Sequence, residues 1–372
     1  MARIDAFFRF MKAQGASDLH LAAGSVPLLR IKGELQRIKY KELDDDELQE
    51  LLFEICPEYK LKQFDETGDI DFAYALEGVG RFRANYFQQL KGSAAVFRQI
   101  PTEILTVAQL GLPQVARRFA LLKKGLVLVT GPTGSGKSTT LAAIIDYANK
   151  IRKDHILTIE DPIEFVHQPY NCLVNHREVG KHTKSFASAL RGALREDPDI
   201  ILIGEMRDLE TISLALETAS TGHLVFGTLH TQSAVKTIDR IIEVFPTGQQ
   251  EQVRNTLSDT LKGVIAQILF KRKDGKISCA QEILVHTPAV ASLIREHKTH
   301  QLINMIQTGK KLGMKTLDDS IQELLDQDLI YPEDAFDKAI DKERFVGYLK
   351  EIPEEYKEMF QKNTNANKYT NS

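Results

Sequence analysis

The chain has 372 residues, of which 42% are hydrophobic and 27% are charged, and its formal net charge is -3. This composition is typical of a soluble globular protein, and the length predicts two domains. The near-neutral charge excludes the global basic footprint of a nucleic-acid-binding protein, although it leaves a local basic patch open.

Cysteine spacing and hydropathy narrow the class of protein further. Cys56, Cys172 and Cys279 are far apart and form no C-x-x-C pair, so the sequence indicates neither a disulfide framework nor a zinc site, and a reducing compartment fits. No apolar run approaches the length that a membrane-spanning helix needs. Asp5 and Arg9 interrupt the first ten residues, which makes them a poor signal peptide. We therefore expect a cytoplasmic protein.

Residues 1–100 predict an N-terminal α+β domain that opens with a helix packed through Phe7, Phe8 and Met11. Residues 44–56 are typical of a helix, because acidic residues stand at their start and leucines recur on one face. Strands are expected at 18–21, 28–31, 69–76, 81–87 and 93–100. Along the strand at 81–87, alternation places Phe82, Ala84 and Tyr86 on one face and Arg81, Arg83 and Asn85 on the other.

A linker is expected at residues 101–112, before a second domain at 113–288. There, segments with strand and helix patterns alternate, as in the parallel sheet of a three-layer α/β core. Its strands would include 126–130, 156–160, 200–204 and 224–228. Residues 289–360 predict a helical region, and the polar, repetitive residues 361–372 predict a disordered tail.

The most specific motif is a glycine-rich loop that fits G-x-x-x-x-G-K-[ST] at every fixed position. A predicted buried strand precedes it and a predicted helix follows it. Backbone N–H groups of such a loop, together with the positive end of the helix, form a cradle for phosphate. Lys137 is expected to reach the β- and γ-phosphates, and the Ser138 hydroxyl to bind Mg²⁺. The motif predicts that a nucleoside triphosphate is bound by Gly131, Pro132, Thr133, Gly134, Ser135, Gly136, Lys137, Ser138 and Thr139.

Two acidic segments follow predicted strands. An apolar strand ends at Glu205, and P-loop enzymes present a carboxylate to Mg²⁺ and its waters in this way. Another strand runs into Glu160, Asp161 and Glu164. Hydrolysis needs a positioned carboxylate to orient or deprotonate the attacking water, so Glu160 and Glu164 are both candidates, and a solvated acidic loop is the alternative.

Two histidines and three arginines complete the candidate residues. His223 and His230 bracket a predicted strand, so both are expected near sheet ends, where ligands collect in open α/β folds. Either could hydrogen-bond phosphate or water, although a structural role explains His223 equally well. Arg81, Arg83 and Arg98 are either solvated arginines or arginine fingers that reach the γ-phosphate held by a neighbouring subunit.

These motifs, in this order, resemble the ATPases of type II secretion and type IV pili. The resemblance covers nearly the whole chain up to about Phe360. It rests on the glycine-rich loop together with Ser17-Asp18-Leu19-His20, Gly80-Arg81-Phe82-Arg83-Ala84-Asn85, Glu160-Asp161-Pro162-Ile163-Glu164, Arg195-Glu196-Asp197-Pro198-Asp199, Gly204-Glu205-Met206-Arg207-Asp208 and Gly227-Thr228-Leu229-His230-Thr231.

The resemblance implies a homohexameric ring whose chains combine an N-terminal PAS-like α+β domain, a RecA-like P-loop ATPase domain and C-terminal helices. It implies that ATP and Mg²⁺ sit between the two domains. It also implies that Glu164 is the catalytic base, that Glu205 works with Mg²⁺ and that arginines cross from the N-terminal domain. We assign catalytic roles to Glu164, Glu205, His230, Arg81, Arg83 and Arg98, and nucleotide binding to Glu160 and His223 beside the glycine-rich loop.

Two features favour the pilus-retraction members of this family. Assembly and secretion members usually carry a tetracysteine zinc site and a long extra N-terminal region, whereas this chain has three scattered cysteines and a first domain that starts at Met1. Residues 291–296 resemble a short helix motif that retraction members need, and an ordinary amphipathic helix is the alternative.

The resemblance therefore implies a motor that powers pilus retraction and twitching motility through a PilC-like platform protein. Such a motor would be cytoplasmic and attached to the inner membrane through the pilus machinery, with neither zinc nor nucleic acid expected. The alternatives are a pilus assembly or type II secretion ATPase, a RecA-like nucleic-acid translocase, and a scaffold that binds ATP without hydrolysing it.

Overall fold

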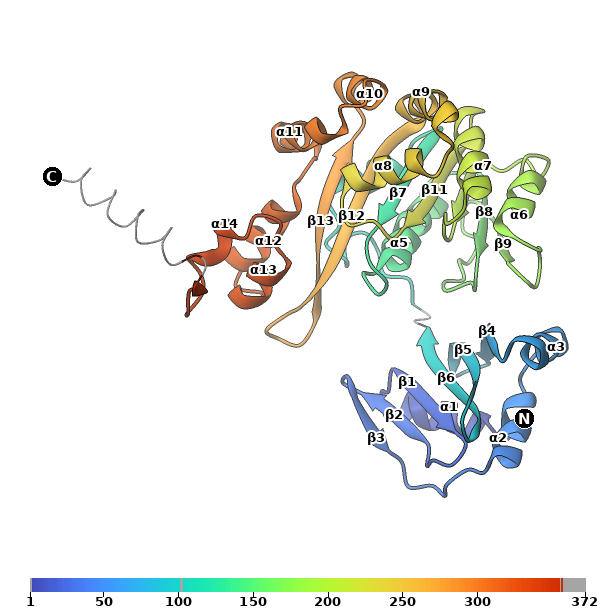
Figure 1. Cartoon of the computed structure of the whole chain (residues 1–372). Helices are drawn as coiled ribbons and strands as arrows, with labels where there is room; N and C mark the ends of the chain where they lie inside the picture. The colour runs from blue at the N-terminus through green and yellow to red at the C-terminus, as the bar shows by residue number, and fades with distance from the viewer. Residues whose placement is uncertain (1, 101–102, 355, 357–372) are drawn as a thin grey trace. The chain divides into compact units, whose positions relative to one another are not determined.

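The computed structural model describes residues 2–100, 103–354 and 356. Packing divides the described chain into two compact units (Figure 1). The first unit contains the residues up to Ile104 together with Thr158–Pro169 and Val174–Ala189, and the second contains the rest. The domain limits expected from the sequence stay predictions. The predicted tail at 361–372 and the first two residues of the predicted linker lie outside the described residues.

The first unit is built on a six-stranded antiparallel sheet in the order β3-β2-β1-β6-β5-β4. Its strands are β1 (Asp18–Ala22), β2 (Leu28–Ile31), β3 (Glu34–Arg37), β4 (Asp69–Leu76), β5 (Gly80–Gln89) and β6 (Gly92–Ile100). The helices that pack on it are α1 (Asp5–Ala13), α2 (Asp45–Phe53) and α3 (Glu58–Thr67). The helix expected at 44–56 is confirmed as α2, and the Asp44 side chain caps it by accepting a hydrogen bond from the Glu47 N–H at 2.9 Å.

Aromatic side chains form the core of this unit. The ring of Phe8 on α1 stacks on Phe82 with centroids 4.4 Å apart and meets the edge of Phe97 at 5.0 Å. Along β5, Phe82, Ala84 and Tyr86 are fully buried while Arg83 is exposed, which confirms the alternation expected from the sequence. The sheet therefore turns one face to its helices and leaves a second face that carries arginines.

The other sheet has seven strands in the order β13-β12-β7-β11-β10-β8-β9. They are β7 (Gly125–Thr130), β8 (His155–Glu160), β9 (Leu173–Glu178), β10 (Ile200–Ile203), β11 (Leu224–Leu229), β12 (Leu261–Lys271) and β13 (Ile277–Val285). The strands expected at 126–130, 156–160, 200–204 and 224–228 are confirmed as β7, β8, β10 and β11. The expected parallel pairing holds for β12, β7, β11 and β10, whereas β12 and β13 form an antiparallel hairpin at the edge. The predicted α/β fold class is confirmed.

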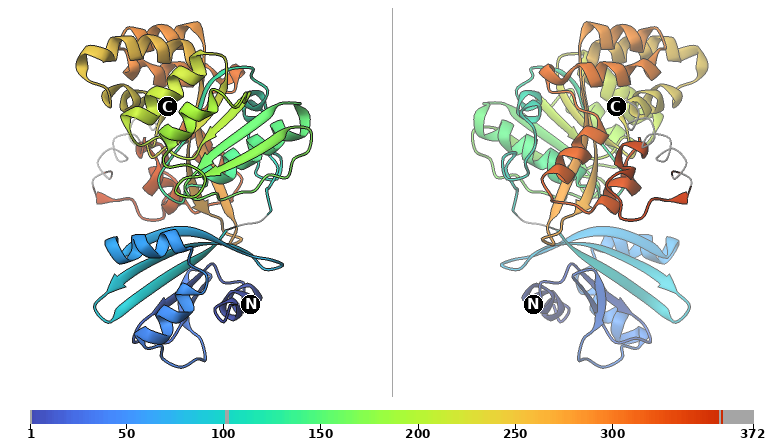
Figure 2. Two further views of the ribbon diagram at one scale, coloured as in Figure 1. Left: turned by 90° about the vertical axis from the view of Figure 1, so that its right-hand side faces the viewer. Right: turned by 90° about the vertical axis from the view of Figure 1, so that its left-hand side faces the viewer.

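Helices surround this sheet on both faces, as Figure 2 shows. Parallel crossovers are right-handed, which places α7 (Leu209–Ser220) and α8 (Ala234–Glu243) on one face of the sheet and α5 (Lys137–Ile151) on the other. The helix α4 (Gln114–Ala120) packs against α5. This part also contains α6 (Phe186–Ala193) and α9 (Gln250–Thr260). None of the helices in the described part of the chain is both long and apolar enough to span a bilayer.

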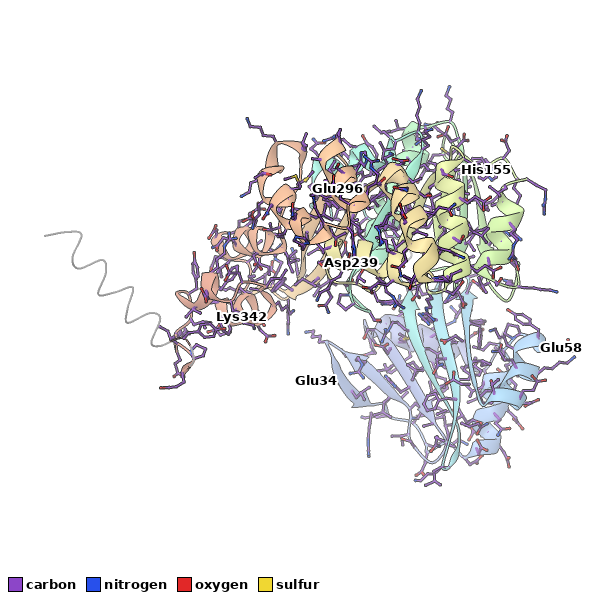
Figure 3. All side chains as sticks on the ribbon, turned by 45° about the horizontal axis from the view of Figure 1, so that its top comes forward. Glu34, Glu58, His155, Asp239, Glu296 and Lys342 are labelled. Atoms are coloured by element: carbon purple, nitrogen blue, oxygen red, sulfur yellow. The ribbon has the colours of Figure 1, made fainter. Side chains whose placement is uncertain are left out.

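The described residues after β13 are helical, which confirms that expectation as far as they reach. They form α10 (Pro288–Arg295), α11 (Leu302–Thr308), α12 (Leu317–Asp326), α13 (Pro332–Lys338) and α14 (Glu343–Val346). Phe270 of β12 and Ala280 of β13 share a small core with α12 to α14. Exposed acidic side chains such as Glu34, Glu58 and Glu296 lie on the outside of their elements (Figure 3).

Replacing Phe82 by alanine should lower the free energy of unfolding of the first unit by about 3–5 kcal/mol, because it removes a fully buried ring from the aromatic core. Leu90 is fully exposed, so Leu90→Ala should change the same quantity by less than about 0.5 kcal/mol. Urea unfolding of the two variants measures both values. Equal stability of the two variants would contradict the packing of Phe82.

Candidate nucleotide-binding site

The glycine-rich loop connects the end of β7 to the start of α5. Gly134 and Gly136 have φ angles of 77° and 82°, in the left-handed region that favours glycine. A Cβ on Gly131 would lie 2.3 Å from the Gln267 carbonyl oxygen, so a side chain there would clash. The Lys137 ammonium donates hydrogen bonds to the carbonyls of Gly131 and Pro132 at 2.9 and 3.0 Å.

This loop fits a bound phosphate. The side-chain oxygen of Ser135 is buried and has no hydrogen-bond partner among the described residues. Lys137 and Ser138 open α5, so the positive end of that helix points at the loop. An anion with several oxygens could accept hydrogen bonds from the backbone N–H groups of such a turn.

Two further predicted residues lie at the same edge of the sheet. β11 pairs with β7 up to Leu229 opposite Thr130, and with β10 up to Ile203 opposite Gly227. The chain following each of these strands therefore emerges beside the glycine-rich loop. His230 directly follows β11, and Glu205 comes two residues after β10.

Glu205 and His230 are in direct contact. The His230 Nε2 atom lies 2.6 Å from Oε1 of Glu205, and Nε of Arg207 lies 2.5 Å from the same oxygen. Burial alone would raise the pKa of Glu205, but the hydrogen bonds from Arg207 and His230 outweigh it, so this pKa lies below its usual range. Glu205 therefore carries a negative charge that can attract a cation.

A cavity of about 580 Å³ joins these groups to the loop. Its lining includes Thr133, Glu205, Arg207, Leu229, His230 and Arg240. The structure thus brings together three of the predicted residues, Thr133, Glu205 and His230. Arg207 and Arg240 were not predicted, although Arg207 could have been found from its place two residues after Glu205. No sequence signal marks Arg240.

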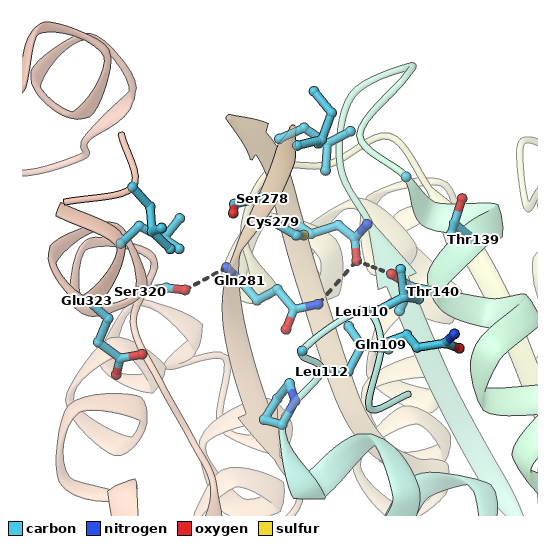
Figure 4. Close-up of a pocket in the computed structure, with 18 of the residues that line it drawn as sticks. Gln109, Leu110, Leu112, Thr139, Thr140, Ser278, Cys279, Gln281, Ser320 and Glu323 are labelled. Carbon is cyan, nitrogen blue, oxygen red and sulfur yellow. Dashed lines mark hydrogen bonds between the residues drawn. The ribbon is translucent and has the colours of Figure 1, made fainter. Parts of the chain in front are cut away.

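A second cavity, of about 610 Å³, lies beside the start of α5 (Figure 4). Gly136, Thr139 and Thr140 line it together with Gln267 and Gln281 of the β12–β13 hairpin. Its remaining lining includes apolar residues of the segment that precedes α4, among them Leu105, Leu110 and Leu112. The sequence analysis predicted no such cavity.

His223 is not part of this arrangement. It precedes β11, and its carbonyl accepts a hydrogen bond from the N–H of Gly125 at the start of β7. Its Nδ1 atom lies 3.1 Å from the Thr218 carbonyl oxygen. β7 runs its full length between this position and the glycine-rich loop, roughly 20 Å of strand. His223 therefore lies at the opposite end of β11 from the glycine-rich loop of its own chain, and its role in nucleotide binding stays a prediction.

The acidic segment after β8 lies in the first unit. Glu160 is nearly buried, and the N–H of Glu164 approaches its carboxylate at 3.4 Å. Glu178 of β9 accepts a hydrogen bond from the N–H of Ile163 at 3.1 Å. His176 of β9 holds the same segment, since its Nε2 atom accepts from the His167 N–H at 3.1 Å.

His176 and Glu178 were missed by the sequence analysis, because their contacts with this segment exist only once β9 lies beside it. Their hydrogen bonds restrict the backbone that carries Glu164. Glu164 itself is partly exposed. The roles assigned to Glu160 and Glu164 stay predictions.

The three predicted arginines belong to the first unit. Arg83 of β5 and Arg98 of β6 are directly opposite each other across the two strands. Arg98 donates a hydrogen bond to Asp18 at 2.8 Å. Arg81 donates to the Ile163 carbonyl at 3.2 Å. Arg83 and Arg98 therefore share one face of the antiparallel sheet, and the role of all three arginines stays a prediction.

A cation could be held at the cavity that contains Glu205. Within the described ranges, no three His, Cys, Asp or Glu side chains are grouped to bind a metal ion by themselves. Mg²⁺ in nucleotide sites is typically held by one or two protein groups together with phosphate oxygens and water. The hydroxyl of Ser138 and the carboxylate of Glu205 are groups of this kind, and the charge of Glu205 fits that use. The absence of zinc expected from the cysteines stays a prediction.

A complete phosphate loop, an ionised carboxylate and a histidine at the carboxyl edge of parallel strands define a P-loop ATPase. The sequence matches the family described as "Type II/IV secretion system protein" over residues 58–328. The chain belongs to this family of ATPases.

Three relatives show how far the similarity extends. The "Type IV pilus retractation ATPase PilT" of Pseudomonas aeruginosa is 53% identical over 336 residues, which cover 90% of this chain and 98% of that protein. The "Twitching motility protein" of Neisseria gonorrhoeae is 51% identical over 318 residues, 85% of each chain. The crystal structure of the pilus retraction motor PilT with bound ADP superposes with a TM-score of 0.85 at 46% identity, covering 92% of this chain and 98% of that one.

Replacing Glu205 by glutamine should lower Mg²⁺-dependent ATP hydrolysis about 10- to 100-fold, because a neutral amide attracts the cation far less than a carboxylate. Binding of ADP in EDTA should stay within about twofold, since the glycine-rich loop is unchanged. Steady-state turnover and calorimetric titration measure the two effects. Glu217→Gln, at an exposed glutamate of α7, is the matched control and should behave as wild type. Wild-type turnover of Glu205→Gln would contradict the role of this carboxylate.

Proposed function

We propose that this ATPase powers the retraction of type IV pili and thereby twitching motility. The observation that carries the proposal is its similarity, over nearly the full length of both chains, to a pilus retraction ATPase. The glycine-rich loop, Glu205 and His230 lie together at one edge of the sheet in this chain. A nucleotide-binding scaffold without turnover is disfavoured, because such a scaffold has no need of Glu164, Glu205 and the arginines.

The chemistry would be divided among the groups described above. N–H groups of the loop from Gly131 to Thr139 and the ammonium of Lys137 bind the phosphates. Ser138 and Glu205 would hold Mg²⁺, and the bound ion would supply positive charge near the phosphates. His230 donates to Glu205 and so fixes the direction of that carboxylate.

Glu164 is the proposed general base, which orients the attacking water and accepts its proton. The Glu160 carboxylate accepts a hydrogen bond from the backbone N–H of Glu164 and would hold the backbone of Glu164 in place. Arg81, Arg83 and Arg98 would be donated by a neighbouring copy of the chain, where their charges stabilise the transferred phosphoryl group. This arrangement needs a neighbouring copy of the chain, which agrees with the homohexamer that the family resemblance implies.

The cavity lined by Thr139 and Gln281 is proposed to hold the adenosine of ATP. It opens directly beside the loop residues that bind phosphate, and its mixture of leucines and amide groups suits a flat heteroaromatic base.

ATP binding would draw rigid parts of the ring together and hydrolysis would release them. We propose that this motion acts on a PilC-like platform protein, so that the motor is cytoplasmic and attached to the inner membrane only through the pilus machinery.

Replacing Glu164 by glutamine should reduce kcat about 10²- to 10⁴-fold, the range for loss of a positioned general base, while ATP affinity stays near wild type. Glu160→Gln is the comparison variant, and its reduction in kcat should be smaller. Steady-state kinetics with a separate binding titration measures both effects. A large loss in Glu160→Gln with near wild-type turnover in Glu164→Gln would transfer the role of base to Glu160.

The direction of work is tested in cells. A deletion strain complemented with Glu164→Gln should carry more surface pili than wild type and should not twitch, because pili extend without being withdrawn. Wild-type chain in the same plasmid is the control and should restore twitching. A strain that lost its pili altogether would indicate an assembly motor instead.

Ala108 lines the proposed adenosine cavity and is exposed, so Ala108→Trp should fill part of the cavity without disturbing a core. We expect KM for ATP to rise at least about tenfold, a loss of about 1.4 kcal/mol in binding. Ala108→Ser leaves the cavity open and should keep the wild-type KM. Unchanged KM in Ala108→Trp would place the adenosine elsewhere.

A further inference from the structure

Gln267 of β12 holds the glycine-rich loop from behind. Its side chain is 1% exposed, and both ends of its amide are used. The Nε2 group donates to the Ser135 carbonyl at 2.7 Å, and Oε1 accepts from the Thr140 hydroxyl of α5 at 2.9 Å. One buried side chain therefore ties the loop to the first turn of the helix that follows it.

A second glutamine fixes the direction of this amide (Figure 4). Gln281 of β13 lies directly opposite Gln267 in the hairpin, and its Nε2 donates to the Gln267 Oε1 at 3.4 Å. The backbone N–H of Gln281 donates to the Ser320 hydroxyl of α12 at 3.0 Å. If the Gln267 amide were flipped, its oxygen would face the Ser135 carbonyl oxygen and its NH₂ would face the Gln281 NH₂. The observed orientation is the one that satisfies all partners.

The direction of the Ser135 carbonyl determines the direction of a phosphate-binding group. In a trans peptide the C=O of Ser135 and the N–H of Gly136 lie in one plane and point to opposite sides. A carbonyl held toward Gln267 therefore turns the Gly136 N–H to the side of the peptide that faces away from Gln267. A Cβ on Gly136 would come within 3.3 Å of the Gln267 Nε2, so the amide also lies against this glycine.

We propose that Gln267 is a positioning residue of the ATPase, which holds the Ser135–Gly136 peptide so that its N–H faces the phosphates, and that Gln281 fixes the Gln267 amide for this purpose. This inference rests on the nucleotide site of the proposed function. It adds a residue from outside the loop to the groups that phosphate binding needs, because no glycine, lysine or serine of the loop fixes the direction of this peptide by itself. The loop keeps its binding shape because the β12–β13 hairpin supports it.

The test uses variants of similar length that cannot hydrogen-bond. Gln267→Met should weaken binding of Mg²⁺–ADP about tenfold, the size of one lost hydrogen bond to a group that must stay ordered. Inorganic pyrophosphate, which contacts only the phosphate cradle, should lose affinity by the same factor. KM for ATP should rise correspondingly while kcat stays within about threefold. Gln281→Met should produce a smaller loss in the same direction.

Gln250→Met is the matched control. The Gln250 amide also donates to a backbone carbonyl, that of Phe245, at 3.0 Å, but it lies in α9 and not in the β12–β13 hairpin. Gln250→Met should keep wild-type affinity for both ligands. This control distinguishes loss of the bond from Gln267 to the Ser135 carbonyl from loss of a glutamine–carbonyl bond elsewhere in the chain. Circular dichroism and thermal unfolding of each variant identify those that fold.

Two results would overturn the inference. One is a folded Gln267→Met protein that binds pyrophosphate like wild type, whatever its affinity for ADP, since a loss confined to ADP would come from the adenosine cavity. If Gln267→Met does not fold, wild-type pyrophosphate binding by Gln281→Met overturns it in the same way. A wild-type chain that binds neither ligand would instead remove the proposed nucleotide site, before any variant is compared.

Discussion

Three parallel strands that end at one edge of a sheet are the constraint on which the candidate site depends. β7, β11 and β10 are paired in continuous parallel register, so the segments that follow them emerge side by side. The glycine-rich loop, His230 and Glu205 are far apart in the chain, and this register alone places them together. A slip of one residue would move every side chain of a strand to the opposite face of the sheet and shift the segment that follows it. The register of β7, β11 and β10 therefore sets the geometry of the site.

Satisfied polar groups beneath the site keep its loops in place. The Thr228 hydroxyl donates to the Gly204 carbonyl at 2.5 Å, which links the end of β11 to the chain that carries Glu205. Glu282 of β13 is buried and accepts from the N–H of Ala234 at the start of α8, at 2.7 Å. Burial raises the pKa of Glu282. Together with Gln267 and Gln281, it makes the β12–β13 hairpin a support for two different edges of the site, so this hairpin is more than an edge of the sheet.

The first unit contributes a face with an unusual charge pattern. Arg83 and Arg98 lie opposite each other on neighbouring strands, where like charges repel. Asp18 offsets part of this repulsion, since it accepts from Arg98 and lies 3.7 Å from the Nε atom of Arg30. Burial would raise the pKa of Asp18, but hydrogen bonds from Ser17 and Arg98 lower it, so the carboxylate stays ionised. Arg83 and Arg98 are exposed on this face, where an anion could approach them, which is the use that the proposed function gives them.

By itself the sequence determined those features that depend on neighbours along the chain. The glycine-rich loop, the alternation in β5 and the four central strands were predictable, because backbone geometry and the period of the apolar residues are local properties. The helix α3 and the strands β9, β12 and β13 were not predicted. In β12 and β13 nearly continuous burial removes the alternation that marks a strand. Only the tertiary structure decided that His223 lies at the end of β11 away from the glycine-rich loop. It also decided that His176, Arg240, Gln267 and Gln281 lie against the functional segments, because these placements come from the pairing order of strands that are distant in sequence.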